Sequence, residues 1–529
     1  MKTQAIALCF LAFSFLFPSL YAQEVNIDWG EKVELKEKVF EILGENSEGI
    51  YSIGGKGKKF FLENFDSQTY EKKFSKEIII KEEDGLKTQL AKMLLLDENL
   101  IMLTYVLDKS AKEARVYGYL LDKNGKARSK RVNILTSSFE KKSRSGYQDI
   151  RISRDRSKLL VCNQRYFKKP DERYKIDLTL FSADLEPIKS ASSEIALNDD
   201  IEIEISNFFV ENDGSFHMAV SEKDRVKGEY ITRKFWIYSY MPFNGFEEQK
   251  IPIELDGKTA TSIALTSDLE GNLIGAGFYG ENYKSGLGRR DGLAGSYFIK
   301  IDPTTNEVLN SSMQEFPTQF TAKVLKEKKA AKGKLIPNFF YPLEIIGKSD
   351  GGAVMVSEYY LAVEGTNGRT ITHYHGPLAI VDIDREGEIN WVKAVPKNQV
   401  YVESRVVLVG FLGPLSLSFA YTPSSAELQT VYHSALFGVN KDKLYVLYND
   451  NPKNEEIEHF RDTKPLRGYL GSVPVVIEID AAGNMEKALL EDGKGEVVLR
   501  PGASLQVKPG ETLLYGTRKR HDKMGRVTY

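Results

Sequence analysis

A short polar turn recurs along this chain and constrains its fold more than any other feature. Four copies have the form Asp-x-x-Gly, at residues 122–125, 268–271, 384–387 and 480–483, and looser versions lie at 184–187, 243–245 and 302–306. Most are preceded by an alternating apolar run and followed by a second strand-like run, which is the pattern of a β-hairpin. A hairpin that returns every roughly 40–60 residues predicts a repeat fold, and among all-β repeats it favours propeller blades.

The number of blades follows from the first turn of each repeat. We predict this turn near eight positions: Ser47, Glu98, Asp155, Asp213, Glu270, Asp350, Lys441 and Pro509. They indicate an all-β propeller of eight four-stranded blades, with seven blades as the alternative. The chain ends only three strands into the last blade, so the fourth is expected from residues 25–29 and 33–35. Sharing one blade between both ends removes an open sheet edge and locks the ring.

Charge and targeting signals narrow the class of protein. Lys and Arg total 72 against 74 Asp and Glu, a net charge of -2, which argues against a nucleic-acid-binding protein because such proteins carry a basic excess. Lys2, the apolar run 5–17, Pro18 and the small residue Ala22 predict a signal peptide over 1–22, leaving 23–529 as a single propeller domain. No later run is long and apolar enough to span a bilayer. We therefore expect an exported, soluble, periplasmic or secreted protein.

Extra length gathers in one class of connection. Residues 318–333 have helix-forming composition with apolar residues on one side, which predicts one inserted surface helix. It would either cover a blade junction or present a basic partner-binding surface. Further long connections are expected over 401–422, where the segment 406–421 is apolar, and over 165–173, 221–232, 279–293, 360–375 and 448–471. In a propeller all of these emerge on one face, and loops on a rigid scaffold commonly carry binding.

Histidines in this set are candidate ligand-binding residues. His373-Tyr374-His375 would place both imidazoles on one side of a strand, as a metal site requires. A third ligand would have to come from His433, His459 or an acid. The alternative is a pair of surface histidines at the start of a strand. The pattern is too weak to predict a metal site.

Two other segments carry candidate ligand-binding residues. Asn449, Asp450 and Asn451 form an oxygen-rich run that either holds calcium or turns the chain by Asx hydrogen bonds. Arg289 and Arg290 lie in a glycine-rich stretch and either meet an anionic ligand or remain solvated. No Gly-x-Ser-x-Gly elbow is present. The sequence identifies no catalytic residue and predicts no cofactor.

Several stretches resemble a known family. The segments 376–397 and 444–454, the start 29–30 through 60–66 and the basic run before the sixth blade are similar to a family of uncharacterised exported WD40- or YVTN-like propeller proteins of Bacteroidota-type bacteria. The resemblance implies a β-propeller and an envelope location, and it implies no activity or catalytic residue. The apolar segment 406–421 departs from the family pattern. The C-terminal run reads as a propeller strand without an appended sorting domain, which favours the periplasm.

The function expected from these patterns is binding. The chain would act as an interaction module for a protein or glycan of the cell envelope, without nucleic acid and without a transmembrane segment in the mature chain. The alternative is a polysaccharide hydrolase or lyase with its site at the channel mouth. The choice depends on whether ionisable groups converge there.

Overall fold

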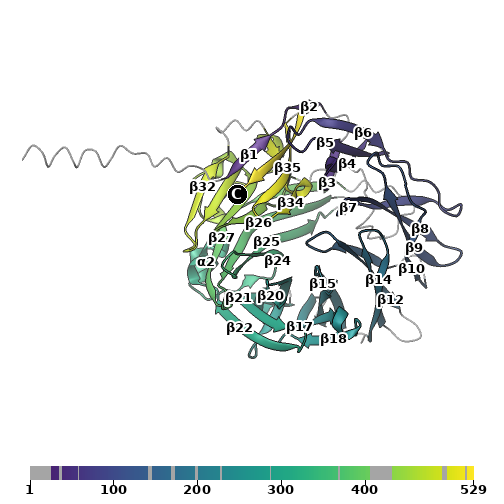
Figure 1. The fold of residues 1–529 in the computed structure, drawn as a ribbon. Coiled ribbons are helices and arrows are strands. Elements are labelled where there is room, and N and C mark those ends of the chain that lie inside the picture. Colours follow the sequence, from purple (N-terminus) through teal and green to yellow (C-terminus); the bar gives the residue numbers. More distant parts are fainter. Residues whose placement is uncertain are drawn as a thin grey trace, which may run out of the picture.

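The structure is a computed structural model that describes most of the chain. The described residues are 25–34, 38–56, 59–140, 146–167, 173–196, 201–226, 229–285, 288–366, 370–404, 432–490, 497–518 and 521–529. They form eight sheets whose main strands follow one another in chain order, each antiparallel to the next. Figure 1 shows the sheets arranged as a ring, with β7, β15 and β24 near the middle and β6, β18 and β32 at the rim. The predicted eight-bladed propeller is confirmed.

The first four blades are regular. Blade 1 contains β3 (Lys38–Asn46), β4 (Gly49–Lys56), β5 (Lys59–Phe65) and β6 (Lys72–Glu77), and blade 2 contains β7 (Thr88–Leu96), β8 (Asn99–Asp108), β9 (Glu113–Leu121) and β10 (Val132–Ser138). Blade 3 contains β11 (Tyr147–Ile152), β12 (Lys158–Phe167), β13 (Arg173–Ser182) and β14 (Pro187–Ala196). Blade 4 contains β15 (Ile201–Val210), β16 (Phe216–Val226), β17 (Glu229–Tyr240) and β18 (Gln249–Pro252), with the 3-10 turn η2 (Pro242–Asn244).

Blades 5 and 6 each gain one extra strand. Blade 5 contains β19 (Thr259–Ser267), β20 (Leu273–Ser285), β21 (Gly288–Asp302) and β22 (Glu307–Glu315), and β23 (Ile336–Pro337) pairs with β21. Blade 6 contains β24 (Phe340–Gly347), β25 (Ala353–Glu364), β26 (Thr370–Ile383) and β27 (Ile389–Val395), and β28 (Gln399–Ser404) pairs with β26. Blade 7 contains β29 (Leu436–Asn440), β30 (Lys443–Asp450), β31 (Val473–Ile479) and β32 (Met485–Leu489), with η3 (Pro452–Asn454), η4 (Phe460–Asp462) and η5 (Tyr469–Gly471).

Blade 8 joins the two ends of the chain. Its inner edge is β33 (Val498–Leu499) and β34 (Leu505–Lys508), separated by η6 (Pro501–Ala503), and it continues with β35 (Glu511–Arg518) and β36 (His521–Thr528). The N-terminal strands β1 (Asn26–Trp29) and β2 (Val33–Glu34) both pair with β36. Asn26 lies opposite Thr528 in this ladder. The predicted shared blade is confirmed, and Figure 1 shows the yellow C-terminal strands beside purple β1 and β2.

Hydrogen bonds to the aspartate side chain stabilise the recurring turns. In the turn after β9, the side-chain Oδ1 of Asp122 accepts hydrogen bonds from the backbone N–H groups of Asn124 (2.8 Å) and Lys126 (2.9 Å). The glycine three residues on has a positive φ of 81°, which favours glycine. Asp268 and Asp384 accept equivalent bonds in their own turns. All eight predicted first turns connect the inner two strands of a blade, as expected.

The hydrophobic core is divided among the seams between blades. Eight clusters of buried residues among the described part of the chain each combine apolar side chains from two consecutive blades. The seam between blades 8 and 1, for example, packs Leu513 and Tyr515 against Ile50 and Phe65. A blade therefore has no core of its own, and both of its faces depend on neighbours.

The inserted helical segment differs from the prediction. Two short helices replace the single expected one: α2 (Thr318–Leu325) and α3 (Glu327–Ala330). The break is at Lys326, whose φ of 137° is incompatible with a helix. Phe320 and Val324 of α2 are buried in the seam between blades 5 and 6, so the expectation of a helix that covers a blade junction is confirmed. Within the described residues, no helix is long and apolar enough to cross a membrane.

Most of the connections that we expected to be long loops also differ from that prediction. We expected loops over 279–293 and 360–375, but β20 and β21 run to a gap of two residues, and β25 and β26 extend well past the body of blade 6. Only the connection between β30 and β31 is long and irregular among those that are fully described. The predicted segment 406–421 lies outside the described residues. We call the face where these extensions and the links between blades emerge the loop-rich face, and the opposite one the turn face.

Replacing Gly438 by alanine should weaken ring closure. A Cβ there would lie 2.3 Å from Cδ2 of Tyr529, the last residue, which is buried at the seam of blades 7 and 8. We expect a loss of about 1–3 kcal/mol in the free energy of unfolding, because the tyrosine ring must move. Urea unfolding monitored by circular dichroism measures it. The matched control is Gly347→Ala, where a Cβ meets nothing within 4 Å; equal stability of the two variants would contradict the packing at this seam.

Candidate functional site

A three-stranded sheet projects from blade 6 on the loop-rich face. β26 is its middle strand, and it pairs with β25 on one side and with β28 on the other. In this register His375 lies opposite both Tyr360 and Gln399, and His373 lies opposite Tyr401. Because side chains alternate across a strand, these residues share one face of the sheet. The prediction that His373 and His375 point to the same side of a strand is confirmed.

Aromatic rings pack together on this first face. The histidine cluster comprises Tyr360, His373, His375, Tyr401 and His433. The His373 ring stacks on Tyr401, with 4.4 Å between centroids and 6° between planes. His433, from the chain just before blade 7, lies 5.3 Å from His375 and 5.1 Å from Tyr401, centroid to centroid. Blade 6 and the start of blade 7 therefore build the cluster jointly.

Hydrogen bonds orient the two imidazoles of the projecting sheet. Nδ1 of His373 lies 2.7 Å from the Tyr360 hydroxyl, and its Nε2 lies 3.1 Å from Oε2 of Glu403. A neutral His373 satisfies both partners by accepting from the tyrosine and donating to the carboxylate. Nδ1 of His375 lies 2.9 Å from Oε2 of Glu358. Donation to that carboxylate leaves Nε2 of a neutral His375 with its lone pair, the form that accepts a proton.

A buried ion pair helps to hold the histidine cluster in place. Nζ of Lys397 is 2.7 Å from Oε1 of Glu358, and both side chains are almost completely buried. Burial alone would raise the pKa of Glu358, but Lys397 and the hydrogen bond from His375 outweigh it and lower the pKa to about 2. Burial lowers the pKa of Lys397, and Glu358 opposes that shift. The carboxylate thus stays charged and holds His375 in place.

The pair is tied to blade 7 through Gln399. Its Oε1 accepts from Lys397 Nζ (3.2 Å) and from the backbone N–H of Ser434 (2.8 Å), and its Nε2 donates to the Asn449 carbonyl (2.9 Å). Lys397 also donates to the carbonyl of His375 (3.2 Å). These bonds fix the sheet relative to blade 7.

The hydroxyl of Tyr401 in the histidine cluster remains protonated. Burial raises its pKa, and the neighbouring Glu403 and Tyr360 raise it further, to about 12.

The second face of the projecting sheet is apolar and exposed. In the same register Thr372 lies between Val363 and Val402, which are 43% and 54% exposed. Tyr374, beside Val400, is 39% exposed. Beside the first face, Tyr341 at the start of β24 is 51% exposed and meets the Tyr360 ring edge-on at 6.3 Å. We call Val363, Tyr374 and Val402 the apolar face.

His459, the other histidine named as a possible third ligand, lies apart from the histidine cluster. Among the described residues, His433 joins the cluster, whereas no ring contact or hydrogen bond links His459 to it. His459 precedes η4 in the irregular connection of blade 7. Within the described residues, no group of three or more His, Cys, Asp or Glu side chains has the arrangement of a metal site. The imidazole nitrogens with assigned partners bind tyrosine and glutamate oxygens instead.

The oxygen-rich run leaves β30 and is engaged within the protein. Asn449 is fully buried; its Nδ2 donates to the carbonyls of Tyr432 (3.0 Å) and Leu499 (2.7 Å). Asp450 forms an ion pair with Lys487 at 2.7 Å. Asn451 caps η3, where its side chain accepts from the backbone N–H of Lys453. These residues connect blade 7 to its surroundings, and a ligand-binding role for them stays a prediction.

The two predicted arginines occupy the tip of a long hairpin. Arg289 and Arg290 pair through the backbone with Lys284 and Tyr283 in the β20–β21 ladder. Both arginines belong to strand β21. The arginine side chains lie outside the described residues, so their role stays a prediction as well.

Several residues of the site escaped sequence reasoning. Glu358, Tyr360, Lys397, Gln399 and Glu403 were not singled out, although one signal was present: Gln399, Tyr401 and Glu403 alternate with two valines. That pattern predicts a strand with one polar side. Its pairing with β26 could not be inferred, because the register depends on a non-local contact.

Comparison with known proteins gives only distant structural matches. No protein-family model and no curated protein matches this sequence. The WD40 domain of SCAP from fission yeast is 11% identical over 96% of this chain and 98% of that chain, with a TM-score of 0.39. The N-terminal domain of Nup159 is 12% identical over 96% of each chain, with a TM-score of 0.33. A polysaccharide lyase, the PL25 ulvan lyase, is 9% identical over 87% of this chain and 96% of that chain, with a TM-score of 0.36.

These overlaps are too loose to carry an argument about function. The class rests on the strand order itself: eight antiparallel four-stranded blades in a closed ring define a β-propeller.

The Glu358→Gln variant should lose both stability and its acid dependence. At pH 7 it leaves Lys397 buried without a counter-charge, which costs about 3 kcal/mol of unfolding free energy. Because the pKa of Glu358 is depressed to about 2 in the folded state, its contribution is complete above about pH 4.3 and is lost as the pH falls toward 2. Urea unfolding between pH 7 and pH 2 should show a smaller decline for the variant than for the wild type.

The double variant Glu358→Gln/Lys397→Met serves as the control for this prediction. Removing both charges should recover much of the lost stability, since no buried charge remains unpaired. A single variant as stable as the wild type at pH 7 would show that the pair does not support the cluster.

Proposed function

We propose that this protein is an exported β-propeller that binds a protein or glycan partner through the loop-rich face of blades 6 and 7. The projecting sheet of β25, β26 and β28 provides the binding surface. Its position is fixed by the Glu358–Lys397 pair and by Gln399, so little ordering is required when a partner binds.

The observation that carries the proposal is the apolar face. One side of the projecting sheet packs the histidine cluster, and the other exposes Val363, Tyr374 and Val402 to solvent, although the solvated face of a sheet is usually polar. Contiguous exposed apolar residues on a rigid element are typical of interaction sites. Tyrosine is among the side chains enriched in such interfaces.

The opposite side of the projecting sheet offers polar groups for specificity. Tyr341 and Tyr360 meet there beside the histidine cluster, and Tyr341 is exposed. The valines favour a protein partner, because sugar rings are bound mainly by aromatic faces and hydrogen bonds. A glycan would instead use Tyr341 and the histidine cluster.

A second candidate function is polysaccharide cleavage. The specific observation in its favour is the convergence of the His375 imidazole with a tyrosine–histidine pair, Tyr360–His373. Such groups can act as general base and general acid in proton abstraction or glycosidic bond cleavage.

Export is part of the proposal and is supported by the sequence. Residues 1–22 combine Lys2, an apolar run and Ala22 before Gln23, which favours secretion and cleavage of a signal peptide, with the periplasm or the exterior as destination. The resemblance of residues 376–397 to exported propellers of Bacteroidota-type bacteria supports a cell-envelope partner. The resemblance suggests a Bacteroidota-type source and membership of that exported family. After cleavage of the signal peptide, residues 23–529 would form one mature propeller domain.

Charge on the apolar face should abolish partner binding. We expect Val363→Asp/Val402→Asp to lose, by at least tenfold, the cross-linked partner that the wild type captures from cell-envelope extract, since buried carboxylates would oppose the contact. Quantitative mass spectrometry of the captured material measures the loss. The matched control is Phe243→Asp/Leu269→Asp, which alters exposed apolar residues in two turns on the turn face and should capture as the wild type does.

An enzyme would give a different result. Incubation of the wild type with polysaccharides would release new reducing ends or unsaturated products, and Tyr360→Phe and His375→Gln would stop the release while Val363→Asp/Val402→Asp would not. That outcome, or equal capture by both aspartate variants, would contradict the binding proposal.

A further inference from the structure

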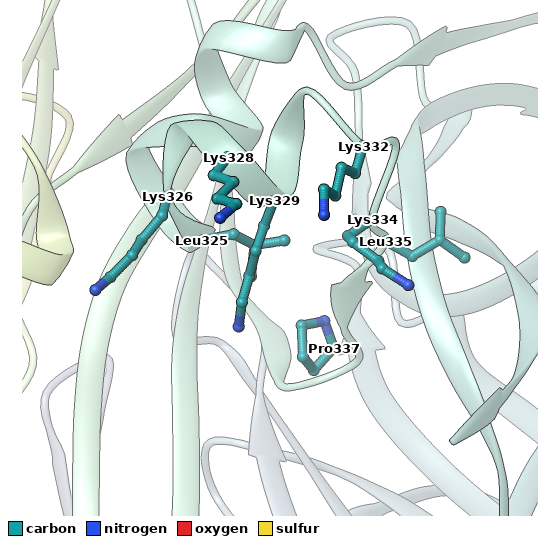
Figure 2. A pocket seen from close by; sticks show the side chains of 8 residues that line it. All are labelled: Leu325, Lys326, Lys328, Lys329, Lys332, Lys334, Leu335 and Pro337. Carbon is teal, nitrogen blue, oxygen red and sulfur yellow. The ribbon is translucent and has the colours of Figure 1, made fainter. Parts of the chain in front are cut away.

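A basic pocket lies apart from the residues of the proposed binding surface, on a segment that precedes blade 6. Its volume is about 550 Å³, and it is lined by eight residues from the link between blades 5 and 6, five of them lysines: Leu325, Lys326, Lys328, Lys329, Lys332, Lys334, Leu335 and Pro337. Figure 2 shows the lysine side chains spread around Leu325 and Pro337, with Lys326 directed away from the others. The lining therefore combines lysine side chains with three apolar residues. Pockets of this size commonly hold small ligands.

The pocket lysines are close together in the sequence and, in the described part of the chain, are not neutralised by ion pairs, whereas some other surface lysines are. Neighbouring Lys323 forms an ion pair with Glu458 at 2.7 Å, and elsewhere Lys59 and Lys258 pair with Glu77 and Glu281. Within the described residues, none of the five pocket lysines lies within ion-pair distance of a carboxylate. Glu327 is the one acidic residue between positions 326 and 334, so this stretch keeps a strong positive charge in a chain that is nearly neutral overall.

The backbone holds the lysines in position. Lys326 adopts a φ of 137°, which separates α2 from α3. The backbone N–H of Lys334 then donates to the carbonyl of Lys329 (3.2 Å), and that of Gly333 donates to Ala330 (2.9 Å). This folding brings together lysines that a continuous helix would distribute around its circumference. A strained non-glycine residue that gathers like charges has a local cost and suggests a functional reason.

The segment is also anchored to the ring. Phe320 and Val324 are buried in the seam between blades 5 and 6, and Nε of Arg461 donates to the Val324 carbonyl at 3.1 Å. The Lys323–Glu458 pair adds a second link to the irregular connection of blade 7. The pocket is therefore part of the rigid loop-rich face, and a ligand does not have to order it.

We infer that this pocket is a binding site for a compact oligoanion, a small molecule with two or more carboxylate, sulfate or phosphate groups and an apolar body. Exposed lysines bind a single charge weakly, so several must act together on one ligand. The ammonium groups would take the oxyanions, and Leu325, Leu335 and Pro337 would contact the apolar part. Lysine, unlike arginine, imposes no planar geometry, which suits tetrahedral as well as planar anions. The inference is independent of the partner-binding face.

Isothermal titration calorimetry of the mature chain tests this site. The probes are citrate, inorganic sulfate and a heparin-derived tetrasaccharide, each at 20 mM and 200 mM NaCl. We expect citrate or the tetrasaccharide to bind at least tenfold more tightly than sulfate, with about tenfold weaker binding at the higher salt because screening shortens the reach of the charges. Which of the two probes binds more tightly distinguishes a carboxylate ligand from a sulfated one.

The variant Lys328→Gln/Lys332→Gln should weaken that binding about tenfold. The matched control is Lys109→Gln/Lys130→Gln, which removes the same charge from exposed positions of blade 2 and should bind as the wild type does. Thermal unfolding by circular dichroism confirms that both variants are folded. Absence of binding by citrate and the tetrasaccharide, or equal weakening in both variants, would overturn the inference.

Discussion

Burial of each blade against its two neighbours is the interaction on which this structure depends. Every cluster of buried residues that spans a seam draws from two consecutive sheets, and the seam between blades 8 and 1 is built like the rest. A sheet of this size cannot bury its apolar faces alone, so stability requires a complete circle. The pairing of β1 with β36 provides this closure, and Arg526 reinforces it by contacting Glu45 of blade 1 at 2.8 Å.

Because the ring of blades is rigid, one of its two faces can carry inserted segments. On the turn face, aspartate side chains saturate short hairpins and leave little room for insertion, as at Asp122 and Asp268. The loop-rich face carries the projecting sheet, the irregular connection of blade 7 and the α2–α3 segment. These three additions contact one another through Lys323, Arg461 and Gln399, so blades 5 to 7 present a continuous decorated region. Both proposed binding sites belong to it.

Sequence reasoning succeeded where the information is local. The Asp-x-x-Gly turns, the eight first turns and the strand that alternates His373 with His375 are all encoded within a few residues. It failed where the outcome depends on distant contacts. Lys326 breaks a segment of strong helical propensity, and nothing about a lysine signals a positive φ. The sequence predicts a loop where β25 and β26 extend, because their pairing with each other and with β28 is non-local.

The candidate site shows the same division. His373 and His375 could be placed on one side of a strand, yet the groups that define their chemistry come from separate positions: Glu358, Lys397 and Glu403. Pairing of β28 with β26 brings these groups together, and the register of that pairing cannot be predicted from either segment alone.

The antiparallel contact between β1 and β36 places residue 26 directly opposite residue 528. The start and finish of the described polypeptide are thus neighbours, as in proteins that tolerate circular permutation. A short covalent link between them would convert the non-covalent clasp into a peptide bond. New termini could then be opened in an Asp-x-x-Gly turn, far from the decorated region, and each blade could be released in turn to measure how strongly the wheel depends on it.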